Sequence, residues 1–160
     1  MLGFLKRRQL PELAAVISGK CIPLEEVKDE VFASKAMGDG VAIVPESSEV
    51  VAPCDGNLRL VANTGHAFGM VSSDGTEILI HIGIDTVKLD GKGFDVLAKQ
   101  GEEVKKGQPI IRFDPDIMKD NNLDMTTMMI LLSKDVMIET YNTGSKLKKG
   151  QDAAIVYRKG

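Results

Sequence analysis

The sequence predicts an all-β fold, an antiparallel β-sandwich or barrel-sandwich with short helical turns. Short stretches rich in valine and isoleucine recur along the chain, and turn signals such as DGN, SDG and LDG separate them. These turn signals recur about every eight to twelve residues, which is typical of β-sandwiches and β-barrels. The chain has 160 residues, 43% of them hydrophobic and 27% charged, which fits one globular domain with its own core.

Eight stretches are expected to form strands, because β-branched residues fit a pleated and half-buried backbone. In chain order they are Gly40–Pro45, Val50–Pro53, Asn57–Ala62, Ala67–Ser72, Glu77–Ile82, Pro109–Phe113, Val136–Tyr141 and Ala153–Tyr157.

Helix is predicted in two short places. Pro115–Asn121 follows Asp114, which suits an N-cap, and proline is favoured in the first turn of a helix. Glu25–Phe32 is expected to form one helical turn. Residues 1–13 are expected to be a flexible tail and residues 14–160 a single domain.

Two segments are similar to each other in sequence, and we call them the echoing segments. Gly101–Ile111 (GEEVKKGQPII) and Gly144–Ile155 (GSKLKKGQDAAI) share a Gly-x-x-apolar-Lys-Lys-Gly-Gln core. Each is expected to form a strand, a turn and a second strand, with a glycine that can adopt a positive φ. The echo suggests an internally duplicated β architecture.

Composition and charge narrow the function classes. The net charge is −3, the chain has no tryptophan, and no basic patch is interleaved with aromatic residues, so we expect no nucleic-acid partner. Cys21 and Cys54 lie far apart without metal-type spacing, which fits a reduced, cytoplasmic setting. No signal peptide or spanning stretch is expected. The apolar and basic N-terminus could at most contact a membrane surface weakly.

The stretch ILIHIGIDTV contains one of only two histidines. Strand alternation places Leu79, His81 and Gly83 on one face and the isoleucines on the other, because successive side chains point to opposite sides. The isoleucine face (Ile78, Ile80, Ile82 and Ile84) is expected to be core. Gly83 is expected to leave open space beside the His81 ring.

The chemistry of the residues alone does not decide the role of His81. A neutral histidine can attack phosphorus with one ring nitrogen if a carbonyl holds the other, and His66 could donate to the phosphoryl oxygens. Thr64 would share a strand face with His66 if that segment were extended. A half-buried histidine with its hydrogen bonds satisfied is the plainer interpretation. A metal site is weakly supported, since HExxH and HxH are absent.

The order of several motifs resembles a known family, the glucose-type enzyme IIA domain of the bacterial phosphoenolpyruvate:sugar phosphotransferase system. Gly75–Val87 (GTEILIHIGIDTV) resembles its active-site signature. Further segments follow in the family's order, and the resemblance extends from about Ile17 to the end: Val31–Pro45, Val50–Gly56, Asn63–Gly69, Lys88–Phe94 and Gly101–Asp114.

The resemblance implies a phosphoryl carrier in sugar uptake. His81 would accept the phosphoryl group from the phosphocarrier protein HPr and pass it to a cysteine of a sugar-specific IIB domain. His66 would stabilise that group, Thr64 would belong to its hydrogen-bond network, and the carbonyl of Gly83 would hold one ring nitrogen of His81. No metal or organic cofactor is implied.

The resemblance also implies a docking surface. Phe32 matches an apolar position of that surface, and Val31 and Met37 are expected to join it. Asp29 and Asp85 match acidic positions that would meet basic groups on a partner. Any membrane association would come through the permease or, weakly, through the tail. The sequence differs from the family pattern at Gly65, where a larger residue is common, and at Thr126-Thr127, where the family usually has Thr-Pro. Both differences are expected to lie away from the chemistry.

Two alternatives accompany this interpretation. One is a regulatory module whose phosphorylation state switches its docking to transporters or metabolic enzymes. The other is a biotinyl- or lipoyl-type carrier, which needs a modifiable lysine in a Met-Lys-Met-type hairpin. The nearest match, Met118-Lys119-Asp120, lacks the flanking residues.

Overall fold

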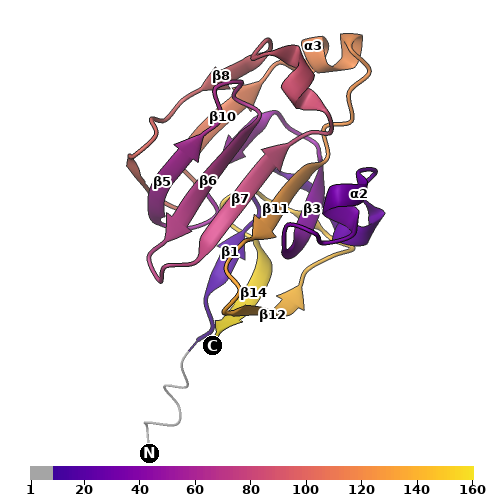
Figure 1. Cartoon of the computed structure of the whole chain (residues 1–160). Coiled ribbons are helices and arrows are strands. Elements are labelled where there is room, and N and C mark those ends of the chain that lie inside the picture. Colours follow the sequence, from indigo (N-terminus) through magenta and orange to yellow (C-terminus); the bar gives the residue numbers. More distant parts are fainter. Residues whose placement is uncertain (1–8) are drawn as a thin grey trace, which may run out of the picture.

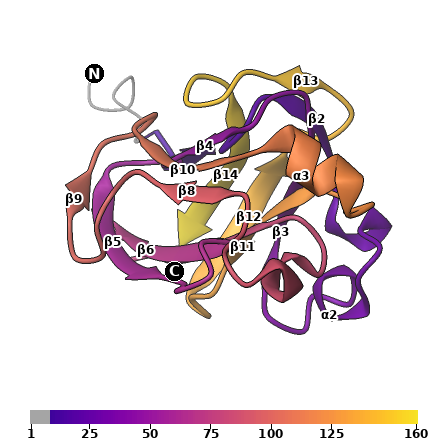
Figure 2. The ribbon, with the colours of Figure 1, turned by 90° about the horizontal axis from the view of Figure 1, so that it is seen from above.

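Antiparallel strands make up most of the computed structural model, which describes residues 9–160 (Figure 1). The largest sheet has eight strands in the order β13 (Lys146–Leu147), β2 (Gly19–Pro23), β3 (Asp39–Pro45), β11 (Thr127–Leu131), β7 (Glu77–Ile82), β6 (Ala67–Ser72), β5 (Gly56–Val61) and β9 (Glu103–Val104). Two three-stranded sheets complete the sandwich, β1 (Glu12–Ala14) with β14 (Ala153–Lys159) and β12 (Val136–Tyr141), and β4 (Glu49–Val51) with β10 (Pro109–Phe113) and β8 (Phe94–Val96). Seen from above, β4, β8 and β10 lie across from β5 and β6 (Figure 2). The predicted all-β antiparallel sandwich is confirmed.

Helices are few and short, as predicted. They are η1 (Leu24–Glu26), α2 (Glu30–Ala33), η2 (Thr86–Leu89) and α3 (Pro115–Asp120). The Asp114 side chain caps α3 by accepting from the backbone N–H groups of Asp116 and Ile117, and Pro115 occupies the first turn. Among residues 9–160, no helix has the length and apolar character that crossing a membrane requires.

The predicted boundary of the N-terminal tail is wrong. Strand β1 begins at Glu12, inside the tail expected to reach residue 13, and Leu13 is fully buried. The backbone N–H of Tyr157 donates to the carbonyl of Pro11 at 3.0 Å, so the chain joins the sheet even before β1. Residues 1–8, on which the expectation of a membrane contact rests, lie outside the described residues.

The two faces of β7 separate two apolar layers. Ile78, Ile80 and Ile82 are fully buried in the main core, as alternation predicts. Ile84 departs from this pattern, because the chain turns at Gly83 and sends Ile84 into a second cluster with Phe32. This second cluster lies where η1 and α2 cover the outer face of the large sheet, and it also contains Leu24, Val27, Ala42, Met128 and Ile130.

The two echoing segments meet in space. Each contributes an edge strand of the large sheet, β9 paired with β5 and β13 paired with β2, and then a strand of a smaller sheet. Their turns touch, because a β-carbon on Gly150 would lie 2.9 Å from the Cα of Gly107. Both glycines have positive φ angles, 86° and 71°, as the shared turn requires. The sequence echo is therefore matched by equivalent positions in the fold.

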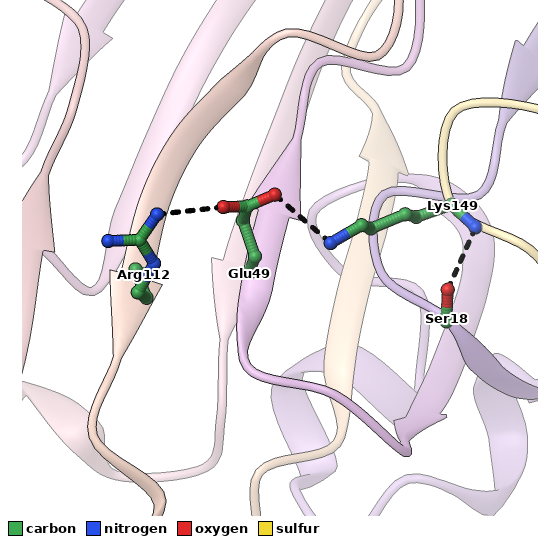
Figure 3. A network of polar contacts seen from close by, with 4 residues as sticks. All are labelled: Ser18, Glu49, Arg112 and Lys149. Carbon is green, nitrogen blue, oxygen red and sulfur yellow. Dashed lines mark hydrogen bonds and ion pairs between the residues drawn. The ribbon is translucent and has the colours of Figure 1, made fainter.

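A polar network joins the sheet of β4 and β10 to the edge of the large sheet near β13 and β2 (Figure 3). Glu49 of β4 accepts from Arg112 Nη2 at 2.9 Å and from Lys149 Nζ at 3.0 Å. The backbone N–H of Lys149 in turn donates to Ser18 Oγ at 3.1 Å. The charge-assisted bond to Arg112, followed by the bond to Lys149, holds the pKa of Glu49 below its ordinary value.

We expect Glu49→Gln to lower the free energy of unfolding by about 1 kcal/mol at pH 7, a value reduced for solvent screening. A carboxylate with a depressed folded-state pKa stabilises above its unfolded pKa of about 4.3, and this contribution is lost as pH falls through the folded value. The difference from wild type should therefore disappear in strong acid. Urea unfolding across this pH range measures it, with Glu46→Gln as the control, because the ion pair of Glu46 with Lys146 lies exposed at the surface. Equal losses in the two variants would contradict the prediction.

Candidate active site

His81 lies on the outer face of β7, at the centre of the large sheet. Its backbone neighbours are Ala67 on β6 and Met128 on β11. The ring is half-buried and packs against Phe32 of α2, with ring centroids 4.9 Å apart. The side chain therefore borders the apolar layer between α2 and the sheet and stays accessible on one side.

The turn at Gly83 fixes one nitrogen of the His81 ring. Gly83 has a φ of +79°, and its carbonyl oxygen lies 2.9 Å from His81 Nδ1. Because a carbonyl only accepts, Nδ1 carries the proton of the neutral ring and Nε2 keeps its lone pair. The hydroxyl of Thr86 donates to the carbonyl of Ile82 at 2.6 Å and ties the turn to the end of β7.

The expected open space beside Gly83 is absent. A β-carbon on Gly83 would lie 2.5 Å from Thr86 Cγ2 and 2.9 Å from Met125 Sδ. Glycine is required here because neighbouring side chains crowd the turn and because the backbone is left-handed. Gly83 thus holds the ring and does not provide room for a ligand.

The ring of His66 packs edge-to-face against the ring of His81. The ring centroids of His66 and His81 are 5.0 Å apart, with the planes at 77°. The Thr64 hydroxyl contacts His66 Nδ1, and the backbone N–H of Ile82 donates to the carbonyl of His66 at 2.7 Å. Thr64 and His66 come together through a turn at Gly65, with φ +69°, and not through the extended segment that alternation assumed.

Burial keeps both histidines neutral near pH 7. Desolvation lowers the pKa of His66 below 6.5. The pKa of His81 is also lowered from 6.5, first by desolvation and then by the neighbouring His66. The Gly83 carbonyl and the carboxylates of Asp29 and Asp85 oppose this shift, which places both acidic groups within electrostatic reach of the ring.

Most of the expected docking residues surround His81. Phe32 is buried against the ring, whereas Val31 beside it is 51% exposed. Asp29 caps α2 by accepting from the Val31 N–H at 3.0 Å. Met37 lies elsewhere, beside a hollow that it lines with Leu131, Val136 and Tyr141. Strand β11 pairs Leu131 with Ile78 and Met128 with His81, so Met37 sits toward the other end of β7 from the histidine.

Two residues that contact the Gly83 turn were not predicted. Thr86 and Met125 both crowd the β-carbon position of Gly83, and neither has a sequence pattern that would identify it. Thr86 lies within the segment that resembles the family's signature, but the resemblance implied no role for it. Met125 is the first residue of the methionine-rich stretch that leads into β11. Among residues 9–160, no group of three His, Cys, Asp or Glu side chains is arranged to hold a metal ion.

We expect Gly83→Ala to destabilise the fold by about 2–4 kcal/mol, because backbone strain adds to a collision with Thr86. Gly101→Ala is the matched control, since Gly101 has a φ of +93° but nothing within 4 Å of its β-carbon position. That variant should lose only about 1 kcal/mol from strain. Denaturant unfolding compares the two, and equal losses would show that the Gly83 turn is not crowded.

A half-buried histidine with one ring nitrogen held by a carbonyl, and with a second histidine edge-on to it, is suited to act as a nucleophile on an all-β sandwich. Comparison with known proteins identifies the family within this class of histidine-nucleophile proteins. The family model described as phosphoenolpyruvate-dependent sugar phosphotransferase system, EIIA 1, matches residues 11–137. The chain belongs to this family, and so to the EIIA components of the sugar phosphotransferase system.

Individual relatives agree with the family match. The chain is 42% identical over 134 residues to the glucose-specific EIIA component of Borreliella burgdorferi, covering 84% of this chain and 71% of that protein. It is 43% identical over 143 residues to the glucoside-specific EIICBA component of Staphylococcus carnosus, covering 89% of this chain but only 20% of that protein. The chain thus spans about a fifth of that relative's length.

A solved structure matches the fold. The glucose permease IIA from Mycoplasma capricolum superposes with a TM-score of 0.85 at 35% identity, covering 92% of this chain and 96% of that one. The predicted family resemblance is confirmed.

Proposed function

We propose that His81 accepts a phosphoryl group on Nε2 from phospho-HPr and passes it to a cysteine of a sugar-specific IIB domain. The observation that carries this proposal is the 2.9 Å contact between His81 Nδ1 and the Gly83 carbonyl. It fixes the tautomer whose lone pair lies on Nε2. The nucleophile then needs no base to remove a proton before it attacks.

In the accepting step, Nε2 of His81 forms a bond to phosphorus as the bond between phosphorus and the donor atom of HPr breaks. The donor atom keeps the electron pair of the broken bond. The positive charge on the ring is shared with Nδ1–H, which the Gly83 carbonyl stabilises. In the passing step a cysteine thiolate attacks phosphorus, and Nε2 leaves with its electron pair, so that His81 returns to the neutral state.

His66 stabilises the phosphoryl oxygens in this scheme. Thr64 donates its hydroxyl hydrogen to His66 Nδ1, which leaves Nε2–H of His66 as a donor. The edge-on geometry of the two rings supports this role, because it brings the second imidazole beside the first without stacking on it. A donor that is already oriented costs no reorganisation as negative charge shifts during transfer.

Both partners would dock on the face around His81. Val31, next to the buried Phe32, is 51% exposed, and Val87 of η2, four residues after Gly83, is 55% exposed. Asp29 and Asp85 add negative charge that would attract basic groups on a partner and steer its approach. The Staphylococcus carnosus relative is named as a joined EIICBA component, which supports a IIB domain as the acceptor. We place this exchange in the cytoplasm.

The proposal is tested by incubating the chain with phosphoenolpyruvate, enzyme I and HPr and following phosphate uptake by intact mass. One phosphoryl group per chain is expected, released by mild acid. Uptake should be near its maximum at pH 7 and should weaken only below about pH 6.5, because the lowered pKa keeps His81 neutral at lower pH than an ordinary histidine. Absence of a mass gain at pH 7 would overturn the proposal.

A further inference from the structure

The segment that follows α3 packs against the Gly83 turn, although its sequence was expected to lie away from the chemistry. The backbone N–H of Ile84 donates to the carbonyl of Asp124 at 2.8 Å. The Met125 sulfur lies 2.9 Å from the place that a β-carbon on Gly83 would occupy. Asp124 and Met125 therefore contact the Gly83 turn directly.

Two buried threonines fix this segment. Asp124 Oδ1 accepts from the backbone N–H of Thr126 at 2.9 Å and from its hydroxyl at 2.7 Å. The hydroxyl of Thr127 donates to the carbonyl of Met125 at 3.0 Å. Thr127 then opens β11 and pairs with Ile82, the last residue of β7. The Thr-Thr pair thus links the segment to the strand that carries His81.

A glycine does not fix the direction of its own carbonyl. Gly83 has the widest conformational freedom of any residue, so neighbouring groups must orient the oxygen that holds His81 Nδ1. Thr86 and Met125 fill the space at the β-carbon position of Gly83, and Asp124 holds the next N–H in the chain. We propose that Asp124 and Met125 are positioning residues, which fix the Gly83 carbonyl and through it the tautomer and orientation of His81. The proposal rests on the proposed function.

The segment has room to move if its contacts are weakened. On its other side lies a surface hollow of about 760 Å³, which Leu123, Asp124 and Met125 line together with Phe113 and Met118. Besides the bond from the Ile84 N–H to the Asp124 carbonyl, the Met125 side chain and the threonine bonds hold the segment at the turn. Removing either should let the Gly83 carbonyl leave His81.

The test compares Met125→Ala with Met125→Leu and with the control Met118→Ala. Met118 is buried and lines the same hollow, but it packs near Gly93 and not Gly83. The first readout is the ring tautomer of His81, measured by ¹⁵N NMR on the unphosphorylated protein. The second is phosphoryl acceptance from phospho-HPr, separated into kcat and KM. Thr127→Val, which is nearly isosteric, covers the case in which Met125→Ala does not fold.

Wild type should hold the Nδ1–H tautomer, whereas Met125→Ala should show a mixture. In that variant kcat should fall on the order of tenfold, because a small misplacement of a reacting group is costly. KM should be unchanged, since Val31, Phe32 and Asp29 remain in place. Met125→Leu should restore both readouts, Thr127→Val should shift both in the same direction as Met125→Ala, and Met118→Ala should resemble wild type.

A wild-type tautomer and rate in both Met125→Ala and Thr127→Val would overturn the inference, as would equal effects in Met118→Ala. If wild type accepts no phosphate, the proposed function fails, but the tautomer comparison still decides whether the segment positions His81.

Discussion

Replacing His81 with alanine should abolish phosphoryl acceptance. No uptake should be seen by intact mass, because the variant lacks the nitrogen that would carry the phosphoryl group. The fold should survive, because the ring is only half-buried and the isoleucine face of β7 is untouched. Circular dichroism and thermal unfolding provide this check.

Phe32→Leu is the matched control for this experiment. Phe32 packs against the His81 ring but has no nucleophilic atom, so its variant should still be phosphorylated. A mass gain that persists in His81→Ala would move the phosphorylation site to another residue. His66 would then be the first candidate, because it is the only other histidine in the chain.

His66→Gln should accept phosphate but pass it on slowly. The glutamine amide can still donate to a phosphoryl oxygen, which allows the phosphorylated state of His81 to form. It is not held by Thr64, so the oriented donor that stabilises the shifting charge is lost. We expect single-turnover transfer to a IIB domain to slow by about 10²–10³-fold, the usual cost of removing one such donor.

Thr64→Val separates orientation from donation, since it leaves His66 in place but removes the hydroxyl that contacts Nδ1. Its transfer rate should lie between those of wild type and His66→Gln. Normal transfer to the IIB domain by His66→Gln would show that His66 is a structural residue.

The fold could be predicted well where one face of a strand is buried and the other is not. Strands β6, β7, β10 and β12 have the bounds that the sequence pattern predicts. Strand β11 was not predicted, because all five of its residues are buried and the strand therefore shows no alternation. The main core covers one of its faces, and the layer under η1 and α2 covers the other. Strand β2 was also not predicted, since glycine and proline at its ends conceal it.

The site could be predicted only in part. Alternation placed His81 opposite the core isoleucines, but it also predicted an empty space at Gly83 that Thr86 and Met125 fill. The contact between Phe32 and His81 joins segments far apart in the chain, so no local pattern could reveal it. The family resemblance was needed to select among the possible roles of His81, and packing then identified which neighbours hold it.

The most direct test of this account is which atom carries the phosphorus. The phosphorylated chain should be prepared with ¹⁵N-labelled histidine and examined by NMR for coupling between phosphorus and the ring nitrogens. The Gly83 carbonyl occupies Nδ1, so the phosphoryl group should be bonded to Nε2 of His81, with Nδ1 still protonated. Phosphorus on Nδ1 of His81, or on His66, would contradict the account.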